Sequence, residues 1–302
     1  MSAKRPGFTL FQLLVVLAVL ALLFALFLPA IAKIRLSAAR IESQNNLRQM
    51  ALACHNYHDV YAMLPPGVDA KGFSTASQLL PYLEQANLWQ QIDFKKSVDD
   101  KDNQKVAAVI VKVFLDPMDP VTQVDKDFGS TNYLFCAGSQ YDLKDNDGVF
   151  FRRSQVKLTD VSDGTSNTLM IGQTLKGDGA AKATDVHRQH VRLTKDDLKK
   201  LGDDSGVKDW KDDKNIAADR CKSWMDGRFL QGTFTATRVL NDEKPDVDCG
   251  GAGGLSGLRS TADTVGIALC DGSTRLIKVT ISRETWKALM TRNGGEVLGP
   301  DF

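Results

Sequence analysis

The sequence contains four histidines, a residue type that can bind metal ions. His55 and His58 stand three residues apart, so a helix would place them on one face, where they could share a metal ion. Two histidines are not sufficient for a zinc site, which also needs ligands such as a carboxylate or a thiolate. We therefore expect this pair to pack and hydrogen-bond within the protein. His187 and His190 lie in a polar segment, and we expect them to be solvated.

An acidic loop at residues 145–148, Asp-Asn-Asp-Gly, has half of the ligand pattern of a calcium loop. Asp145 and Asp147 would supply the carboxylate oxygens that calcium prefers. Leu143 stands at the first ligand position, however, and no glutamate closes the loop. We therefore expect an ordinary Asp-Gly turn and no cofactor, and we keep Asp145 and Asp147 as the calcium candidates.

Five cysteines are spread along the chain without a Cys-x-x-Cys pair, which argues against a zinc ribbon and a thioredoxin-like site. They are Cys54, Cys136, Cys221, Cys249 and Cys270. An odd number leaves at least one thiol unpaired, and a disulfide is permitted if the protein lies outside the cytoplasm. Cys221 and Cys249 flank the least regular segment, so we expect any disulfide to join these two.

The sequence contains none of the residue patterns that mark common enzymes. Gly-x-Ser-x-Gly, a Walker loop and His-Glu-x-x-His are all absent, so we expect no enzymatic activity. Lys and Arg number 38 against 37 Asp and Glu, which gives a net charge of +1. Nucleic-acid binding needs a concentrated basic face, so we expect no nucleic-acid partner.

An uncharged segment of 25 residues, Phe8–Ala32, precedes all of these groups. About 20 apolar residues suffice for a helix to cross the hydrocarbon core of a membrane, so this segment is predicted to span one. Lys4 and Arg5 before it favour a cytoplasmic N-terminus. An uncleaved anchor is one alternative. Another is a secretory signal cut at Ala30-Ile31-Ala32, although the apolar part of such signals is usually only about 7–15 residues long.

The helix is predicted to continue over residues 33–63 and to become amphipathic there. Apolar residues recur at spacings of three and four, which is the pattern of one helix face. They are Ile34, Ala38, Ile41, Leu47, Met50, Cys54, Tyr57 and Tyr61. Pro65 and Pro66 then end the helix, because consecutive prolines cannot extend it.

Residues 64–302 are predicted to form a globular α+β head. Helical patterns cover Ser77–Ile92, Gln104–Leu115 and Ser282–Arg292, and strand patterns cover Ser130–Cys136, Val149–Phe151, Asn167–Gly172, Phe229–Val239, Thr264–Cys270 and Thr274–Val279. Asp271-Gly272 between the last two strands predicts a hairpin. Residues 175–250 are charged and irregular, so we expect a solvated insertion, or alternatively a partner-binding loop, with a flexible link at Gly250–Gly257.

The N-terminus resembles a type IV prepilin signal. Lys4-Arg5-Pro6-Gly7 is followed by Phe8-Thr9-Leu10, and in prepilins a peptidase cuts after the glycine and the new N-terminus is methylated. The resemblance makes residues 1–7 a leader, Gly7 and Phe8 the processing residues, and Pro29 the helix-bending proline that pilins have near this position. Pilins usually have Glu at the fifth mature position, where this chain has Gln12, so assembly is less firmly implied than cleavage.

The rest of the chain is similar to the prepilin-type bacterial proteins of domain-of-unknown-function family 1559. Strings that carry this resemblance include NNLRQMALACHNYHD, LPPG, LLPYLEQANLWQQIDF, STNYLFCAG, TDVSDGTSNTLMIGQ and CDGSTRLIK, in family order. The resemblance implies a pilin-like α+β fold, in which a long N-terminal helix, half transmembrane and half amphipathic, packs on a mainly antiparallel sheet. It implies no established activity.

Three positions depart from the pattern of that family. Its His-x9-Asp-Gly motif has Thr261 in place of the histidine before Asp271. Ser43 and Asp116 stand where relatives commonly have cysteines. Because both cysteines are absent together, we interpret this as loss of a disulfide between helix and head, which requires the two positions to be close in space.

Two classes of function follow. The first is a membrane-anchored, pilin-like structural protein of a pilus-like or type II secretion-like assembly, with inner-membrane lipid, a prepilin peptidase and N-methyltransferase, and other pilin-like subunits as partners. The second is a tethered binding module that never polymerises, which Gln12 favours. In both, we expect one pass through the cell inner membrane, with the head periplasmic or extracellular.

Overall fold

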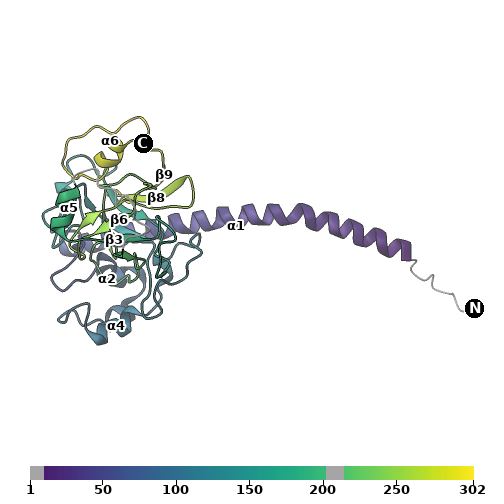
Figure 1. Cartoon of the computed structure of the whole chain (residues 1–302), viewed down its shortest axis with the longest axis horizontal. Helices are drawn as coiled ribbons and strands as arrows, with labels where there is room; N and C mark the ends of the chain where they lie inside the picture. Colours follow the sequence, from purple (N-terminus) through teal and green to yellow (C-terminus); the bar gives the residue numbers. More distant parts are fainter. Residues whose placement is uncertain (1–9, 202–213) are drawn as a thin grey trace, which may run out of the picture.

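A single long helix, α1 (Leu10–Tyr61), leads into the head in this computed structural model, which describes residues 10–201 and 214–302. At 1.5 Å per residue its 52 residues extend about 78 Å, and half of that length stands clear of the head (Figure 1). Ala62 adopts a left-handed conformation (φ 57°) and donates to the His58 carbonyl, which ends the helix before Pro65. The predicted end of the helix is confirmed.

The predicted membrane span over Phe8–Ala32 is not confirmed in the part of the chain that is described. Across residues 10–201 and 214–302, no helix is both long enough and apolar enough to cross a membrane.

Short helices on the head replace the longer ones predicted from the sequence. The predicted helix Ser77–Ile92 is divided into α2 (Thr75–Leu79), the 3₁₀ helix η1 (Leu80–Leu83) and α3 (Ala86–Trp89). Pro81, which has no N–H to donate, lies in the first turn of η1, and Glu84 after this helix has a left-handed conformation (φ 59°). The remaining helices are α4 (Lys101–Ala107), η2 (Lys112–Phe114), η3 (Leu158–Asp160), α5 (Lys195–Leu201) and α6 (Arg283–Ala288).

A five-stranded sheet in the order β5-β1-β2-β8-β9 is the centre of the head. Its strands are β1 (Tyr133–Gly138), β2 (Leu169–Gln173), β5 (Thr233–Thr235), β8 (Thr264–Leu269) and β9 (Thr274–Lys278). All neighbours pair antiparallel except β1 with β5, so the mainly antiparallel sheet is confirmed. The predicted hairpin is β8–β9, where Gly272 takes the positive φ (82°) that the turn requires. The predicted strand Val149–Phe151 is absent, and Phe229–Val239 shrinks to β5.

A second sheet arises where the sequence predicted an irregular insertion. Its order is β4-β3-β6-β7, from β3 (His190–Arg192), β4 (Ile216–Ala217), β6 (Asp246–Asp248) and β7 (Gly254–Leu255). The prediction of a solvated, irregular segment is therefore wrong for the described part of residues 175–250. The glycine-rich stretch also belongs to the fold, because β7 pairs antiparallel with β6.

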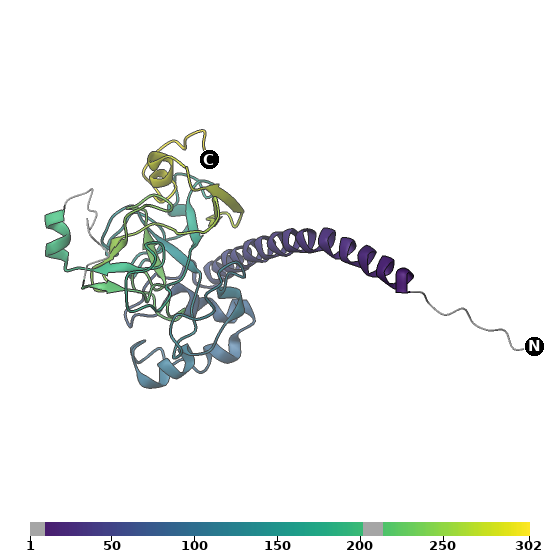
Figure 2. The same cartoon turned by 45° about the vertical axis from the view of Figure 1, so that its right-hand side comes forward.

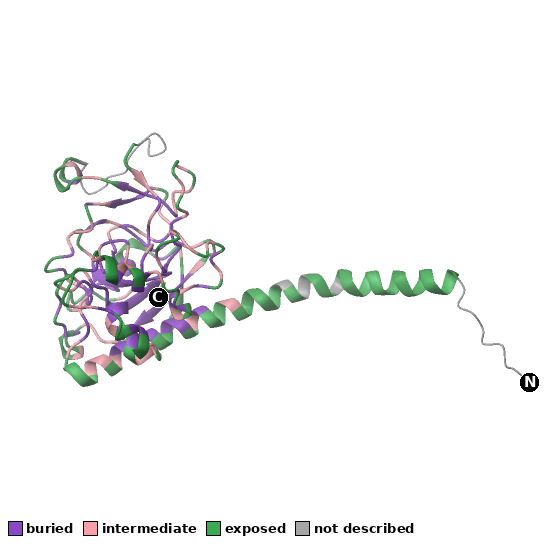
Figure 3. Ribbon diagram, turned by 90° about the horizontal axis from the view of Figure 1, so that it is seen from below, coloured by how far each residue is buried: buried purple, intermediate pink, exposed green. Residues whose placement is uncertain are grey.

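Both faces of the five-stranded sheet are covered. Leu47, Met50 and Cys54 of α1 are fully buried in one hydrophobic cluster with Phe135 of β1, and the head end of α1 is the buried part of this helix (Figure 3). Leu134, the preceding residue of β1, points into a different cluster with Trp286 of α6. Successive side chains of a strand face opposite sides, so β1 is buried throughout because α1 covers one face and α6 the other.

Candidate assembly surface

The N-terminal half of α1 presents apolar side chains on all of its sides. Fifteen large apolar residues between Leu10 and Ile31 each keep 43–77% of their surface exposed. They are Leu10, Phe11, Leu13, Leu14, Val15, Val16, Leu17, Val19, Leu20, Leu22, Leu23, Phe24, Phe27, Leu28 and Ile31. A helix that is apolar all round normally lies in an apolar environment, so we regard this half of α1 as the candidate assembly surface.

The residues predicted from the prepilin resemblance belong to this region. Gly7 and Phe8 lie outside the described residues. Gln12 lies in the first turn of α1, where its side chain is exposed. The helix continues through Pro29 without interruption, and α1 follows a smooth curve (Figure 2).

At the opposite end, α1 is attached to the head by polar contacts as well as by its buried face. The Ser43 hydroxyl lies 3.0 Å from the Tyr133 hydroxyl, and Ser43 and Asp116 line one small cavity. Asn46 donates to the Leu115 carbonyl at 3.0 Å. Burial raises the pKa of Asp116, although hydrogen bonds from Met118 N–H, Gln173 and Ser43 act in the opposite direction.

The expected proximity of Ser43 and Asp116 is thus confirmed. Two buried side chains, Ser43 of α1 and Asp116 of the head, line one small cavity at the positions where the family resemblance implies a lost disulfide. At these two positions the contact between helix and head is polar and non-covalent.

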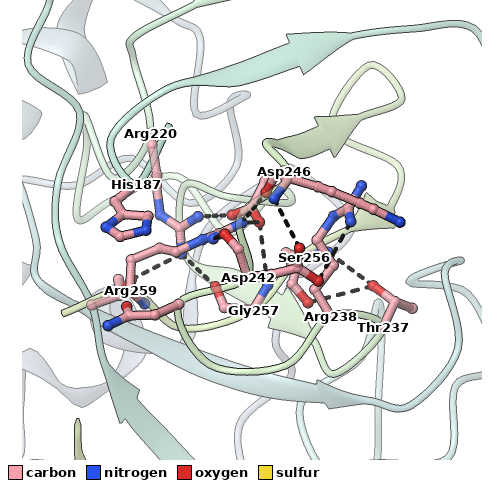
Figure 4. A network of polar contacts seen from close by, with 12 residues as sticks. His187, Arg220, Thr237, Arg238, Asp242, Asp246, Ser256, Gly257 and Arg259 are labelled. Atoms are coloured by element: carbon pink, nitrogen blue, oxygen red, sulfur yellow. Dashed lines mark hydrogen bonds and ion pairs between the residues drawn. The ribbon is translucent and has the colours of Figure 1, made fainter. Parts of the chain in front are cut away.

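A buried ionic network connects the second sheet to the first. Asp246 of β6 accepts from Arg259 at 2.6 Å and pairs with Arg220, and all three side chains are fully buried (Figure 4). Arg220 also donates to the Gly257 carbonyl at 2.8 Å and to the Thr174 hydroxyl at 2.9 Å. Burial lowers the pKa of both arginines to about 10. Both remain charged at neutral pH, so Asp246 offsets two buried cations.

A second buried network of paired charges lies beside the first. Asp119 accepts from Arg188 at 2.9 Å and lies 3.5 Å from the Lys176 ammonium. Burial opposes ionisation of Asp119, but the Lys176 charge and the Arg188 hydrogen bond outweigh it, so the pKa of Asp119 is lowered. Burial also lowers the pKa of Lys176. The three charged side chains therefore compensate one another in the interior.

The four histidines differ in how far they match the expectations from the sequence. The prediction that His190 is solvated is wrong: it is 1% exposed, and burial lowers its pKa to about 4 against the opposing effect of Asp219. His187 is half-buried, and burial together with the Arg259 charge lowers its pKa. His58 packs on the head as expected, where its Nε2 accepts from the Leu158 N–H at 3.4 Å. His55 Nε2 is buried beside Gly272 and has no hydrogen-bond partner among the residues that the structure describes.

The two calcium candidates are not brought together as ligands. Asp145 is exposed, with a left-handed backbone (φ 53°) in the turn. Asp147 uses both carboxylate oxygens, which accept from the backbone N–H and the hydroxyl of Ser139, each at 2.6 Å. Within residues 10–201 and 214–302, no group of three or more His, Cys, Asp or Glu side chains could hold a metal ion.

The expected disulfide between Cys221 and Cys249 is not formed. All five cysteines are free thiols and are buried. Cys221 lies in the hydrophobic cluster of Leu134 and Trp286, whereas Cys249 lies in another with Leu198 and Val247. Because the two cysteines belong to different hydrophobic clusters, nearness to the ends of one segment does not predict that they pair.

Sequence reasoning missed the buried ionic networks entirely. Arg220, Asp246 and Arg259 carry no motif, and their partners are 13 or more residues away in the chain. The one usable signal is the high charge of residues 175–250, which by itself indicates a solvated segment.

Comparison with known proteins identifies the family but no activity. A family model described as a protein of unknown function (DUF1559) matches residues 32–284. The match covers most of the chain, although it does not extend to the N-terminal segment that resembles a prepilin signal. Neither the curated proteins nor the solved structures contain a match. The chain therefore belongs to the DUF1559 family of proteins of unknown function.

Proposed function

We propose that this protein is a pilin-like structural subunit, anchored in the inner membrane by its N-terminal helix and displaying its head outside the cytoplasm. The observation that carries the proposal is the contrast along α1. Leu47, Met50 and Cys54 are fully buried under the head, whereas the fifteen apolar residues from Leu10 to Ile31 have no protein covering them within the described chain. Covering one such side chain contributes about 1.5–3 kcal/mol, so the assembly surface favours lipid or other helices strongly.

The processing residues support the same proposal from the sequence alone. The membrane segment is proposed to be Phe8–Ala32, whose first two residues lie outside the described part of the chain. A prepilin peptidase and N-methyltransferase would cut after Gly7 and methylate Phe8. In the membrane, helices associate through side-chain packing, so apolar α1 segments of neighbouring subunits would lie side by side with their heads outward.

A tethered module that does not polymerise is the second candidate, and Gln12 is the observation that favours it. Gln supplies hydrogen bonds but no carboxylate charge, whereas pilins usually have Glu there. Such a protein would use the same anchor and export route but would remain a single subunit in the membrane.

Cysteine crosslinking separates the two candidates, since all five native thiols are buried and give little background. Leu17→Cys places a thiol on the assembly surface, and Lys112→Cys places a matched one on the exposed surface of the head. In native membranes, a pilin-like subunit with Leu17→Cys should form a crosslinked dimer, and one with Lys112→Cys should not. A second cysteine, Phe24→Cys or Leu28→Cys, added to Leu17→Cys should extend the dimer into a ladder of multimers. Monomer alone from all variants would favour the tethered module.

The intact mass of the same membrane protein tests processing independently. A chain beginning at methylated Phe8 supports the proposed peptidase. A chain beginning at Met1 would reduce the proposal to an uncleaved anchor, and one beginning at Lys33 would remove the anchor altogether.

A further inference from the structure

An open cleft of about 550 Å³ lies on the head between the two sheets. The loop at Ser139–Tyr141, the two residues just after β5, strand β7 and helices α5 and α6 form its walls. This volume is within the range of about 300–1,000 Å³ that small-ligand sites occupy. None of the lining residues belongs to the assembly surface. Thr237 borders the buried ionic network in Figure 4, and the other lining residues lie outside the ionic networks.

The charge of the cleft is positive and is not neutralised by its own lining. Lys199 of α5 and Arg283 and Lys287 of α6 face it, and among the residues described here none of the three forms an ion pair. No Asp or Glu lines the cleft in the described chain. Arg283 and Lys287 are four residues apart, which places them on one side of α6. An anion in the cleft would therefore meet cations from two separate helices.

The walls are held in place before any ligand arrives. Lys195 of α5 pairs with Asp142 of the loop at 2.6 Å, and the Tyr141 carbonyl accepts from the Gly254 N–H of β7 at 2.7 Å. On the other side, Trp286 is fully buried and donates to the Arg238 carbonyl at 3.0 Å, which orients α6. A preformed site loses less conformational entropy on binding.

The lining between the cations is apolar and includes an aromatic ring. Tyr141, 41% exposed, lies in the cleft with Leu198, Leu255 and Ala236. A simple anion such as phosphate would use the cations and leave this surface in water. A sugar ring that carries a carboxylate would use both, because its C–H face packs on apolar and aromatic groups while its charge pairs with Lys and Arg.

An acidic peptide fits the cleft less well. A peptide that adds a strand needs an exposed edge with several backbone groups to pair with. The strands at this cleft, β5 and β7, are only three and two residues long.

We propose that this cleft binds an acidic oligosaccharide, with Arg283, Lys287 and Lys199 pairing its carboxylates and Tyr141 supporting a sugar ring. This site is independent of helix assembly and would function in a filament subunit and in a tethered module alike.

The test is a calorimetric titration of the full-length protein in mild detergent with an oligogalacturonate. A neutral galactose oligomer of the same length serves as the sugar control, and inorganic phosphate serves as the anion control. Lys287→Gln is compared with Lys112→Gln, which removes the same charge from an exposed position that does not line the cleft. Tyr141→Ala tests the sugar contact separately.

The proposal expects the oligogalacturonate to bind and the neutral oligomer not to bind. Lys287→Gln should weaken binding about tenfold, whereas Lys112→Gln should leave the Kd within about twofold. Tyr141→Ala should weaken oligogalacturonate binding without unfolding the head, as judged by an unchanged thermal transition. The proposal is overturned if oligogalacturonate does not bind, or if phosphate binds in its place. It is also overturned if Lys287→Gln and Lys112→Gln change the Kd equally, or if Tyr141→Ala leaves the Kd unchanged.

Discussion

At the scale of single residues, the head depends on charges that are buried with too few counter-charges. Asp246 faces both Arg220 and Arg259, and every one of these side chains is inaccessible to water. A buried ion pair is not by itself evidence of high stability, since desolvation of the ions offsets their attraction. Removing one partner is nevertheless costly, because it leaves an uncompensated charge in the interior.

Asp246→Ala therefore destabilises the head strongly. It leaves two buried guanidinium groups without their carboxylate, which should lower the free energy of unfolding by about 3–5 kcal/mol. Asp99→Ala is the control: Asp99 pairs with Arg228 at 2.7 Å but is 58% exposed, so its loss should cost less than about 1 kcal/mol. Urea unfolding followed by tryptophan fluorescence measures both. Similar small effects from the two variants would show that the network contributes nothing specific.

Asp248 gives the head a pH dependence of identifiable sign. Burial raises its pKa to about 6, despite the hydrogen bond from Gly251 N–H and the charges of Arg192 and Arg228. A carboxyl group whose pKa is higher in the folded state binds more protons when folded, so its contribution to stability falls as the pH rises from about 4 to above 6.

Asp248→Asn should remove this pH-dependent loss, because the amide oxygen can still accept from Gly251 N–H at 2.8 Å. At about pH 7.5 the variant should be more stable than the unmodified protein by about 1–2 kcal/mol, and near pH 4 the two should converge. Urea midpoints at both pH values measure this difference. An offset of the same size at both pH values would mean that packing, and not ionisation, causes it.

At the scale of elements, α1 packs on the head with one face of its C-terminal half. Leu47 is fully buried against the sheet, while Leu52, five residues later, is 59% exposed. Leu47→Ala should lower the free energy of unfolding by about 2–5 kcal/mol, through lost burial and the cavity that remains. Leu52→Ala, the same substitution on the same helix, should stay within about 0.5 kcal/mol. Chemical denaturation compares the two, and a large loss from Leu52→Ala would place α1 differently on the head.

The elements that could be predicted from the sequence are those with a local signal. The end of α1 follows from its proline pair and the β8–β9 hairpin from Asp271-Gly272, while β1 follows from a run of strand-forming residues. The second sheet has no such signal, because its strands are two or three residues long and β3 pairs in parallel with β6, more than fifty residues away. Its charges looked solvated because only the folded chain brings Arg220 and Arg259 to Asp246.

The two candidate sites, the assembly surface and the cleft, also differ in whether a local sequence signal predicts them. The candidate assembly surface lies within one continuous stretch of sequence, Leu10–Ile31, so the sequence displays it directly. The cleft between the sheets takes its cations from α5 and α6, which are about ninety residues apart in the chain. No spacing rule connects such positions before the fold is known.

At the scale of the whole molecule, we expect the two halves of α1 to have separable purposes, and truncation tests this directly. A chain beginning at Ser37 lacks the entire assembly surface but keeps Ser43, Leu47 and Cys54, which attach the helix to the head. Because the removed side chains are exposed in the single subunit, their loss should leave the urea midpoint of the head unchanged. The truncated protein should remain monomeric in water by light scattering, whereas the full chain should require detergent, since large exposed apolar surfaces drive association. Aggregation or unfolding of the truncated head would show that residues before Ser37 stabilise it, and a full chain that is monomeric without detergent would remove the basis for anchoring and assembly alike.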